Sequence, residues 1–88
     1  MYQITKYSYR QAKMLGVEIK NSTNKTKKID VFKNGEKIAS IGFLGMKDYP
    51  TYIKEKGKAY ADTRKKLYYI RHSKNKGLND FYAKKILW

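Results

Sequence analysis

Few residues of this chain belong to the types that carry out covalent or metal chemistry. Its 88 residues include seven Asp and Glu, one His and no Cys. His72 therefore has no cysteine with which to form a nucleophilic pair or a Cys/His zinc site. Metal-dependent hydrolysis needs carboxylates that converge on a divalent ion, whereas the acidic residues here are scattered among lysines. Glu18-Ile19-Lys20 matches half of a nuclease motif, but a match this short often arises by chance. We therefore expect a non-enzymatic protein with no metal site and no cofactor.

Charge gives a stronger signal than any catalytic pattern. Twenty-one Lys and Arg residues give a formal net charge of +14 and an isoelectric point near 10.0. A field of this sign favours a polyanionic partner, which would be nucleic acid, an anionic membrane surface or an acidic protein face. The same charge also occurs in basic domains that are merely soluble. Nine Tyr, three Phe and one Trp distinguish the chain from a disordered basic tail, so we expect it to fold.

Two groups of basic residues are candidates for contacting such a partner. The first mixes cations with aromatic rings on a predicted helix, where cations would bind phosphates and Tyr would stack on exposed bases. Its members are Arg64, Lys65, Tyr68, Arg71 and His72. An equally good interpretation is that Tyr68 belongs to the core and that the cations only solvate the helix. The second group precedes a predicted hairpin, where lysines can reach a backbone phosphate although they are usually solvated. It consists of Lys25, Lys27 and Lys28.

The clearest local pattern is Asn34-Gly35 between two strand-like runs. Both central residues of a type I′ turn need positive φ, which Asn and Gly tolerate best. The pair therefore predicts a hairpin of residues 28–33 with residues 36–41. A lone hairpin is marginal in water, so we expect residues 17–20 to add a third antiparallel strand.

Alternation along the two hairpin strands assigns their side chains to faces. It places Ile29 and Val31 on one face together with Ile38, and it places Ala39 and Ile41 on the other face. A helix is then expected to cover one of these faces.

The remaining segments are predicted to be helical. Residues 8–16 form a short helix that Ser8 caps and Gly16 ends. The longest helix, residues 59–72, carries an apolar stripe with spacings of three and four. The stripe consists of Tyr60, Thr63, Leu67 and Ile70. Residues 73–77 interrupt this helix.

Residues 80–88 form a last short helix, and Trp88 anchors its apolar end. A large aromatic side chain beside Ile86 and Leu87 would either close the small core of this chain or insert into a neighbouring protein. We favour packing within the chain, because a small domain rarely leaves such a side chain unused.

The segment GFLGMKDYPTY, residues 42–52, joins the hairpin to the helices and is predicted to be a structural elbow. Gly42 and Gly45 can adopt conformations that a Cβ disfavours. Pro50 suits the first turn of a helix, and Asp48 is placed to cap that helix.

Three blocks of residues form a specific combination. They are KK-x-D-V-F-x-x-G over residues 27–35, G-x-x-D-Y-P-x-Y over residues 45–52, and Arg71-His72 with the closing Leu87-Trp88. Together they resemble a group of small uncharacterised basic proteins that large DNA viruses and tailed phages encode. The likeness covers most of the chain and departs from the group at residues 73–79. It implies a viral or phage origin and names no biochemical function.

These observations predict one α+β domain over residues 1–88, a small antiparallel sheet with helices packed on it. We expect a viral or phage accessory protein, located in the virion and the host-cell cytoplasm. It would bind packaged nucleic acid or an acidic face of the capsid by electrostatics, with no small-molecule substrate. One alternative is a sequence-independent DNA- or RNA-binding protein that acts in the infected cell. A weaker one is a small metal-dependent nuclease that uses Asp30 or Glu36. No apolar run approaches the roughly 20 residues of a membrane span, and the oligomeric state stays open.

Overall fold

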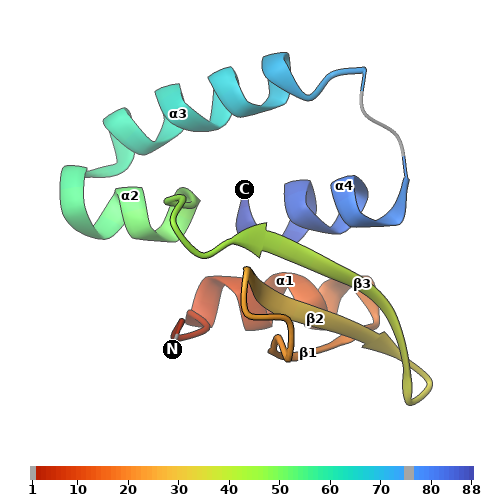
Figure 1. The fold of residues 1–88 in the computed structure, drawn as a ribbon. Coiled ribbons are helices and arrows are strands. Elements are labelled where there is room, and N and C mark those ends of the chain that lie inside the picture. Colours follow the sequence, from red (N-terminus) through yellow and green to blue (C-terminus); the bar gives the residue numbers. More distant parts are fainter. Residues whose placement is uncertain (1, 75–76) are drawn as a thin grey trace.

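The computed structural model confirms the α+β prediction (Figure 1). It describes residues 2–74 and 77–88, so residues 75–76 of the predicted break at 73–77 lie outside the described residues. In chain order the elements are α1 (Lys6–Leu15), β1 (Glu18–Asn21), β2 (Lys27–Lys33), β3 (Glu36–Phe43), α2 (Tyr49–Lys56), α3 (Lys58–Arg71), α4 (Leu78–Tyr82) and the π-helical segment η1 (Ala83–Leu87).

The three strands form an antiparallel sheet in the order β1-β2-β3. The two-residue turn lies where the sequence predicts it, because Lys33 pairs with Glu36 across the loop. Asn34 has φ 53° and Gly35 has φ 79°, as a type I′ turn requires.

A bulge in β3 reverses the predicted assignment of its faces. Phe32 pairs with Lys37, but the next pair joins Val31 to Ala39, which leaves Ile38 as an extra residue. One inserted residue moves every later side chain to the other face of a strand. The apolar residues of β2 and of the second half of β3 therefore share one face. Our prediction that they point to opposite faces is wrong.

The shared apolar face packs against α1 and the C-terminal segment, which runs between the sheet and α3 (Figure 1). Ile29, Ile41, Ile86 and Leu87 are at most 1% exposed and belong to one core cluster. Trp88 is also buried, so its side chain packs within the chain as we favoured.

The first helix begins three residues earlier than predicted. Thr5, not Ser8, is its N-cap, because the Thr5 hydroxyl accepts a hydrogen bond from the Ser8 amide at 3.2 Å. The Ser8 hydroxyl is buried and donates to the Ile86 carbonyl at 2.9 Å, which ties α1 to η1. Gly16 ends the helix with φ 73°, as predicted.

Helix α3 turns a different face to the body from the one its apolar stripe predicted. Tyr60 is 45% exposed, Leu67 44% and Ile70 60%. Ala61 is fully buried instead, and half-buried Tyr68 packs against the core cluster. The prediction failed because the periodicity alone could not show which side of α3 the C-terminal segment would cover.

Only some of the residues predicted to shape the joint between β3 and α2 have the expected roles. Gly42 has φ 75°, and an added Cβ would lie 2.7 Å from Leu87 Cδ1. Gly45 has neither a positive φ nor a close neighbour, so the special conformation predicted for it is absent. Asp48 caps α2 by accepting from the Thr51 amide at 3.1 Å, and Pro50 lies in the first turn.

Candidate functional site

A cleft of about 590 Å³ lies between α3, the end of β3 and the C-terminal segment. We call it the α3–β3 cleft. Its lining combines cations with aromatic rings from three parts of the chain, namely Lys27, Phe43, Lys47, Arg64, Tyr68, Arg71, His72 and Trp88.

One wall of the cleft is a single face of α3. Arg64, Tyr68 and His72 are four residues apart and Arg71 follows Tyr68 by three, so the four residues share one side of the helix. The guanidinium of Arg64 also lies 5.5 Å from the centre of the Tyr52 ring, which holds it beside the cleft.

The opposite wall comes from the edge of the sheet and the loop after it. Lys27 begins β2 and pairs across the sheet with Phe43, the last residue of β3. The Lys27 ammonium lies 4.0 Å from the centre of the Phe43 ring, and Phe43 is 59% exposed. Met46 and Lys47 continue this wall. An exposed ring beside a lysine offers a stacking surface next to a positive charge.

Tyr68 is held in a stack of rings. Its ring centre lies 4.5 Å from that of Trp88, with an interplanar angle of 12°, and 4.2 Å from that of His72, with an angle of 27°. Two nearly parallel rings this close do not fit side by side on one face, so they occupy opposite faces of Tyr68. Burial, together with the nearby Asp80 carboxylate, raises the pKa of the Tyr68 phenol, which keeps it neutral. Tyr68 therefore joins α3 to the C-terminus and has no free face for a base.

The acidic residues of the cleft are neutralised within the chain. Asp48 is 1% exposed, and its carboxylate lies 3.0 Å from the ammonium of Lys28, itself 4% exposed. Burial alone would raise the pKa of Asp48, but hydrogen bonds from the Thr51 amide and the Tyr2 hydroxyl, with the Lys28 charge, hold it below its ordinary value. Asp80 pairs with Lys84 at 2.8 Å.

The positive charges of the cleft are less compensated. Within residues 2–74 and 77–88, no carboxylate forms an ion pair with Lys27, Arg64 or Arg71. The cleft therefore presents a net positive field.

The structure brings together most of the residues that the sequence singled out for binding. Lys27 and Lys28, predicted as one loop group, line the same cleft as Arg64, Tyr68, Arg71 and His72. Lys28 lies inside β2, not in the loop, and it is buried against Asp48.

Two predicted residues lie elsewhere. Lys25 lines a separate hollow of about 150 Å³ beside Tyr2 and Asn21. Lys65 lies 4.8 Å from the centre of the Tyr49 ring, outside the cleft.

Sequence reasoning missed the contribution of the elbow. Phe43, Met46 and Lys47 line the cleft, and the two apolar side chains are both 59% exposed. The available signal was the run Phe43-Leu44 with Met46 in a glycine-flanked loop, where large apolar side chains have no structural reason to occur.

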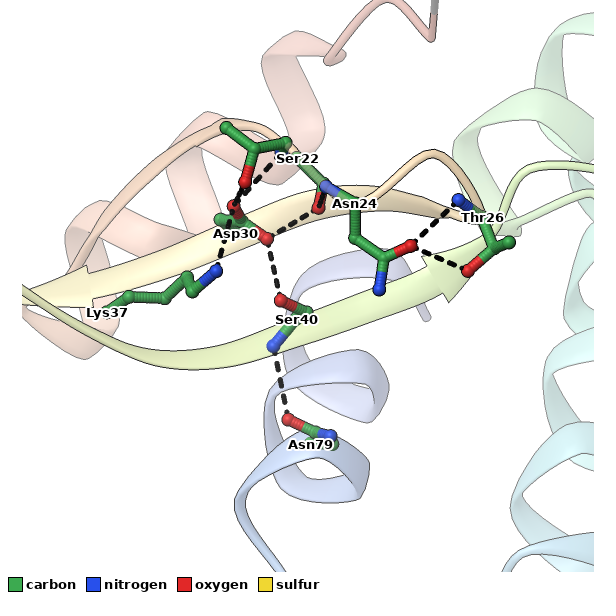
Figure 2. Close-up of polar contacts among 8 residues, drawn as sticks. Ser22, Asn24, Thr26, Asp30, Lys37, Ser40 and Asn79 are labelled. Atoms are coloured by element: carbon green, nitrogen blue, oxygen red, sulfur yellow. Dashed lines mark hydrogen bonds and ion pairs between the residues drawn. The ribbon is translucent and has the colours of Figure 1, made fainter.

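The second acidic centre is structural. Asp30, 1% exposed in the middle of β2, accepts hydrogen bonds from the Ser22 hydroxyl at 2.6 Å and the Ser40 hydroxyl at 2.7 Å (Figure 2). Lys37 lies 3.7 Å from it. Burial would raise the pKa of Asp30, but these hydrogen bonds and the Lys37 charge lower it. Asp30 and Asp48 are therefore both buried carboxylates that hydrogen bonds and a lysine hold within the fold.

No protein-family model, curated protein or solved structure gives a significant match to the chain. Among the described residues no cluster of three His, Cys, Asp or Glu side chains is arranged to hold a metal ion. None of the described helices combines the length and the apolar character that crossing a membrane needs.

Proposed function

We propose that this chain is a non-enzymatic protein that binds single-stranded nucleic acid in the α3–β3 cleft. The observation that carries the proposal is the convergence of Arg64 and Arg71 on one wall with Lys27 and exposed Phe43 on the other. Cations on both sides can follow a phosphate backbone, and an exposed ring can stack on a base whatever its identity.

The proposal specifies unpaired bases. In a duplex the flat faces of the bases are covered by their neighbours, so Phe43 could stack only on a base that is unstacked or at an end. The volume of about 590 Å³ falls in the range of clefts that hold small ligands or a short piece of a polymer.

An acidic protein face is the second candidate, because it is also a polyanion. Exposed Phe43 beside Lys27 favours nucleic acid over it, since an acidic protein surface gains little from an isolated stacking ring. The resemblance to proteins of large DNA viruses and phages supports packaged or replicating viral nucleic acid as the partner, and association with the virion stays a prediction.

Charge at the cleft can be tested with two matched double variants. Arg64→Gln with Arg71→Gln removes two cations from the cleft, while Arg10→Gln with Lys13→Gln removes two exposed cations from α1. The affinity for labelled oligo(dT) would be measured by fluorescence anisotropy across a series of salt concentrations. Single strands give a log–log salt slope of about −0.7 per phosphate contact, so the slope of the cleft variant should be less steep by about 1.4. The α1 variant should leave it nearly unchanged.

Stacking can be tested with a second matched pair. Phe43→Ala removes the exposed ring of the cleft, and Phe81→Ala removes a 45% exposed ring outside it. Stacking on one base is worth about 1–3 kcal/mol, so Phe43→Ala should weaken binding roughly 5- to 150-fold. If each cleft variant changed the affinity no more than its matched control, binding would not be located in the cleft, and the proposal would fail.

A further inference from the structure

The outward face of α3 carries an apolar seam that is largely exposed, although the first ring of the seam, Tyr60, lies 5.6 Å from that of Tyr52 in α2. Tyr60, Thr63, Leu67 and Ile70 follow one another at spacings of three, four and three. The three apolar side chains among them are 44–60% exposed. The helix already packs on the body through Ala61 and Tyr68, so this seam is a second face.

The spacing of the seam is that of the a and d positions of a heptad repeat. With Tyr60 at a, Thr63 is d, Leu67 is a and Ile70 is d, while buried Ala61 falls at b. The body of the protein therefore covers the side of α3 that a coiled coil leaves to solvent, and it leaves the a/d side open.

The seam is narrow. At 100° per residue its four side chains fall within an arc of about 80°. Helices that lie on a membrane carry a broader apolar face, whereas a strict a/d stripe is the narrow contact surface of paired helices. The geometry therefore favours a partner helix over a lipid surface.

The residues beside the seam indicate the charge of that partner. Arg64 and Arg71 occupy the e positions, and Lys66 occupies a g position. Residues at e and g set partner choice by pairing across the interface. A second copy of this chain would place Lys66 against Arg71 in a parallel pair, or like positions against each other in an antiparallel pair. Every such arrangement opposes two cations, so self-pairing is disfavoured.

We propose that the α3 seam docks an amphipathic helix of a partner protein whose apolar stripe is flanked by Glu or Asp. Helix α3 is formed and fixed before binding, so only the partner loses conformational freedom. Leu67 and Ile70 do not line the α3–β3 cleft, so the apolar part of the seam is separate from the nucleic-acid site, whereas the flanking Arg64 and Arg71 belong to both surfaces.

The probe for this surface is a designed three-heptad peptide with Ile at a, Leu at d and Glu at e and g. Its own glutamates oppose each other, which keeps it monomeric. One control peptide has Ser at a and d and keeps the glutamates, and another keeps the apolar seam and has Lys at e and g. Binding to the full chain would be measured by fluorescence anisotropy. We expect the first peptide to bind at least tenfold more tightly than either control.

Variants of the chain distinguish binding at the seam from attraction by the net positive charge. Leu67→Ser with Ile70→Ser should reduce binding of the acidic peptide at least tenfold, whereas Leu78→Ser, at a 56% exposed position of α4, should not. Both variants should keep the melting temperature and the affinity for oligo(dT) of the unchanged chain. Equal binding of the Ser-seam peptide would overturn the proposal, because charge alone would then explain binding. Self-association of the chain through the seam would also overturn it. So would binding to anionic vesicles, if the variant Leu67→Ser with Ile70→Ser abolished that binding.

Discussion

Replacing Trp88 by Ala tests whether the C-terminus fixes α3 in place. Trp88 is 9% exposed and stacks on Tyr68 with a ring separation of 4.5 Å. The contacts between α3 and the C-terminal segment include this stack and two hydrogen bonds of 2.8 Å, from the Tyr69 hydroxyl to the Lys84 carbonyl and from the Lys84 ammonium to the His72 carbonyl. The stack is the apolar part of that joint.

The expected loss of stability can be worked from this burial. A buried aromatic side chain removes about 150–250 Å² from water, which at about 25 cal/mol per Å² corresponds to about 4–6 kcal/mol. Measured truncations of Trp or Phe to Ala cost about 3–5 kcal/mol. An 88-residue chain has a total stability of about 4–13 kcal/mol, so even the lower figure is a large share. At about 4–8 °C per kcal/mol, the melting temperature should fall by roughly 12 °C or more.

The assay is thermal unfolding followed by circular dichroism, with hydrogen exchange to locate the effect. Trp88→Phe is the matched control, since it keeps a ring that can stack on Tyr68, and it should lose less than half as much. Amide exchange in Trp88→Ala should accelerate more in α3 than in β2, because β2 lies at the centre of the sheet. A fall of less than about 3 °C in Trp88→Ala would refute the reasoning, since it would mean that the stack contributes under 1 kcal/mol.

Two further predictions concern the joint between β3 and α2. Gly42→Ala should cost about 2–4 kcal/mol in urea unfolding, because it adds a Cβ 2.7 Å from Leu87 Cδ1 to a left-handed conformation. Gly16→Ala, with φ 73° and no atom within 4 Å, should cost only about 1–2 kcal/mol; equal losses would contradict the packing argument. The pKa of Asp48 is lower in the folded chain than its ordinary value, so its contribution to stability is complete above about pH 4 and is lost as pH falls further. Asp48→Asn should lower the free energy of unfolding at neutral pH by about 3 kcal/mol. Its melting temperature should fall less between pH 5 and pH 3 than that of the unchanged chain. Parallel pH profiles of the two proteins would show that Lys28 and Asp48 do not act as described.

The sequence predicted those parts of the fold that local rules decide. Asn34-Gly35 predicted the turn and thereby the hairpin, because few other residues tolerate two successive positive φ values. The bulge at Ile38 could not be predicted, because no turn residue marks it and the alternation of apolar residues looks regular without it. Tertiary contact, not local preference, fixes the register beyond that point.

The candidate site was predicted on its helical side only. Arg64 and Arg71 followed from the helix period, whereas Lys28 was misplaced because its partner, Asp48, lies 20 positions further along the chain. Phe43 was missed because its role depends on α3 folding back over the sheet edge, which no local pattern encodes. Which side of α3 faces the body likewise depends on Trp88, a residue from another part of the chain, which stacks on Tyr68.

The most direct test of the central claim is to map the binding surface by amide chemical shifts. Uniformly ¹⁵N-labelled chain would be titrated with oligo(dT) at moderate salt, and the shifts would be followed residue by residue. We predict that the largest changes occur at Lys27, Phe43, Lys47, Arg64 and Arg71, which line the α3–β3 cleft from both sides. Changes spread evenly over the exposed cations of α1 and the other elements, or an absence of changes at saturating oligo(dT), would contradict the account.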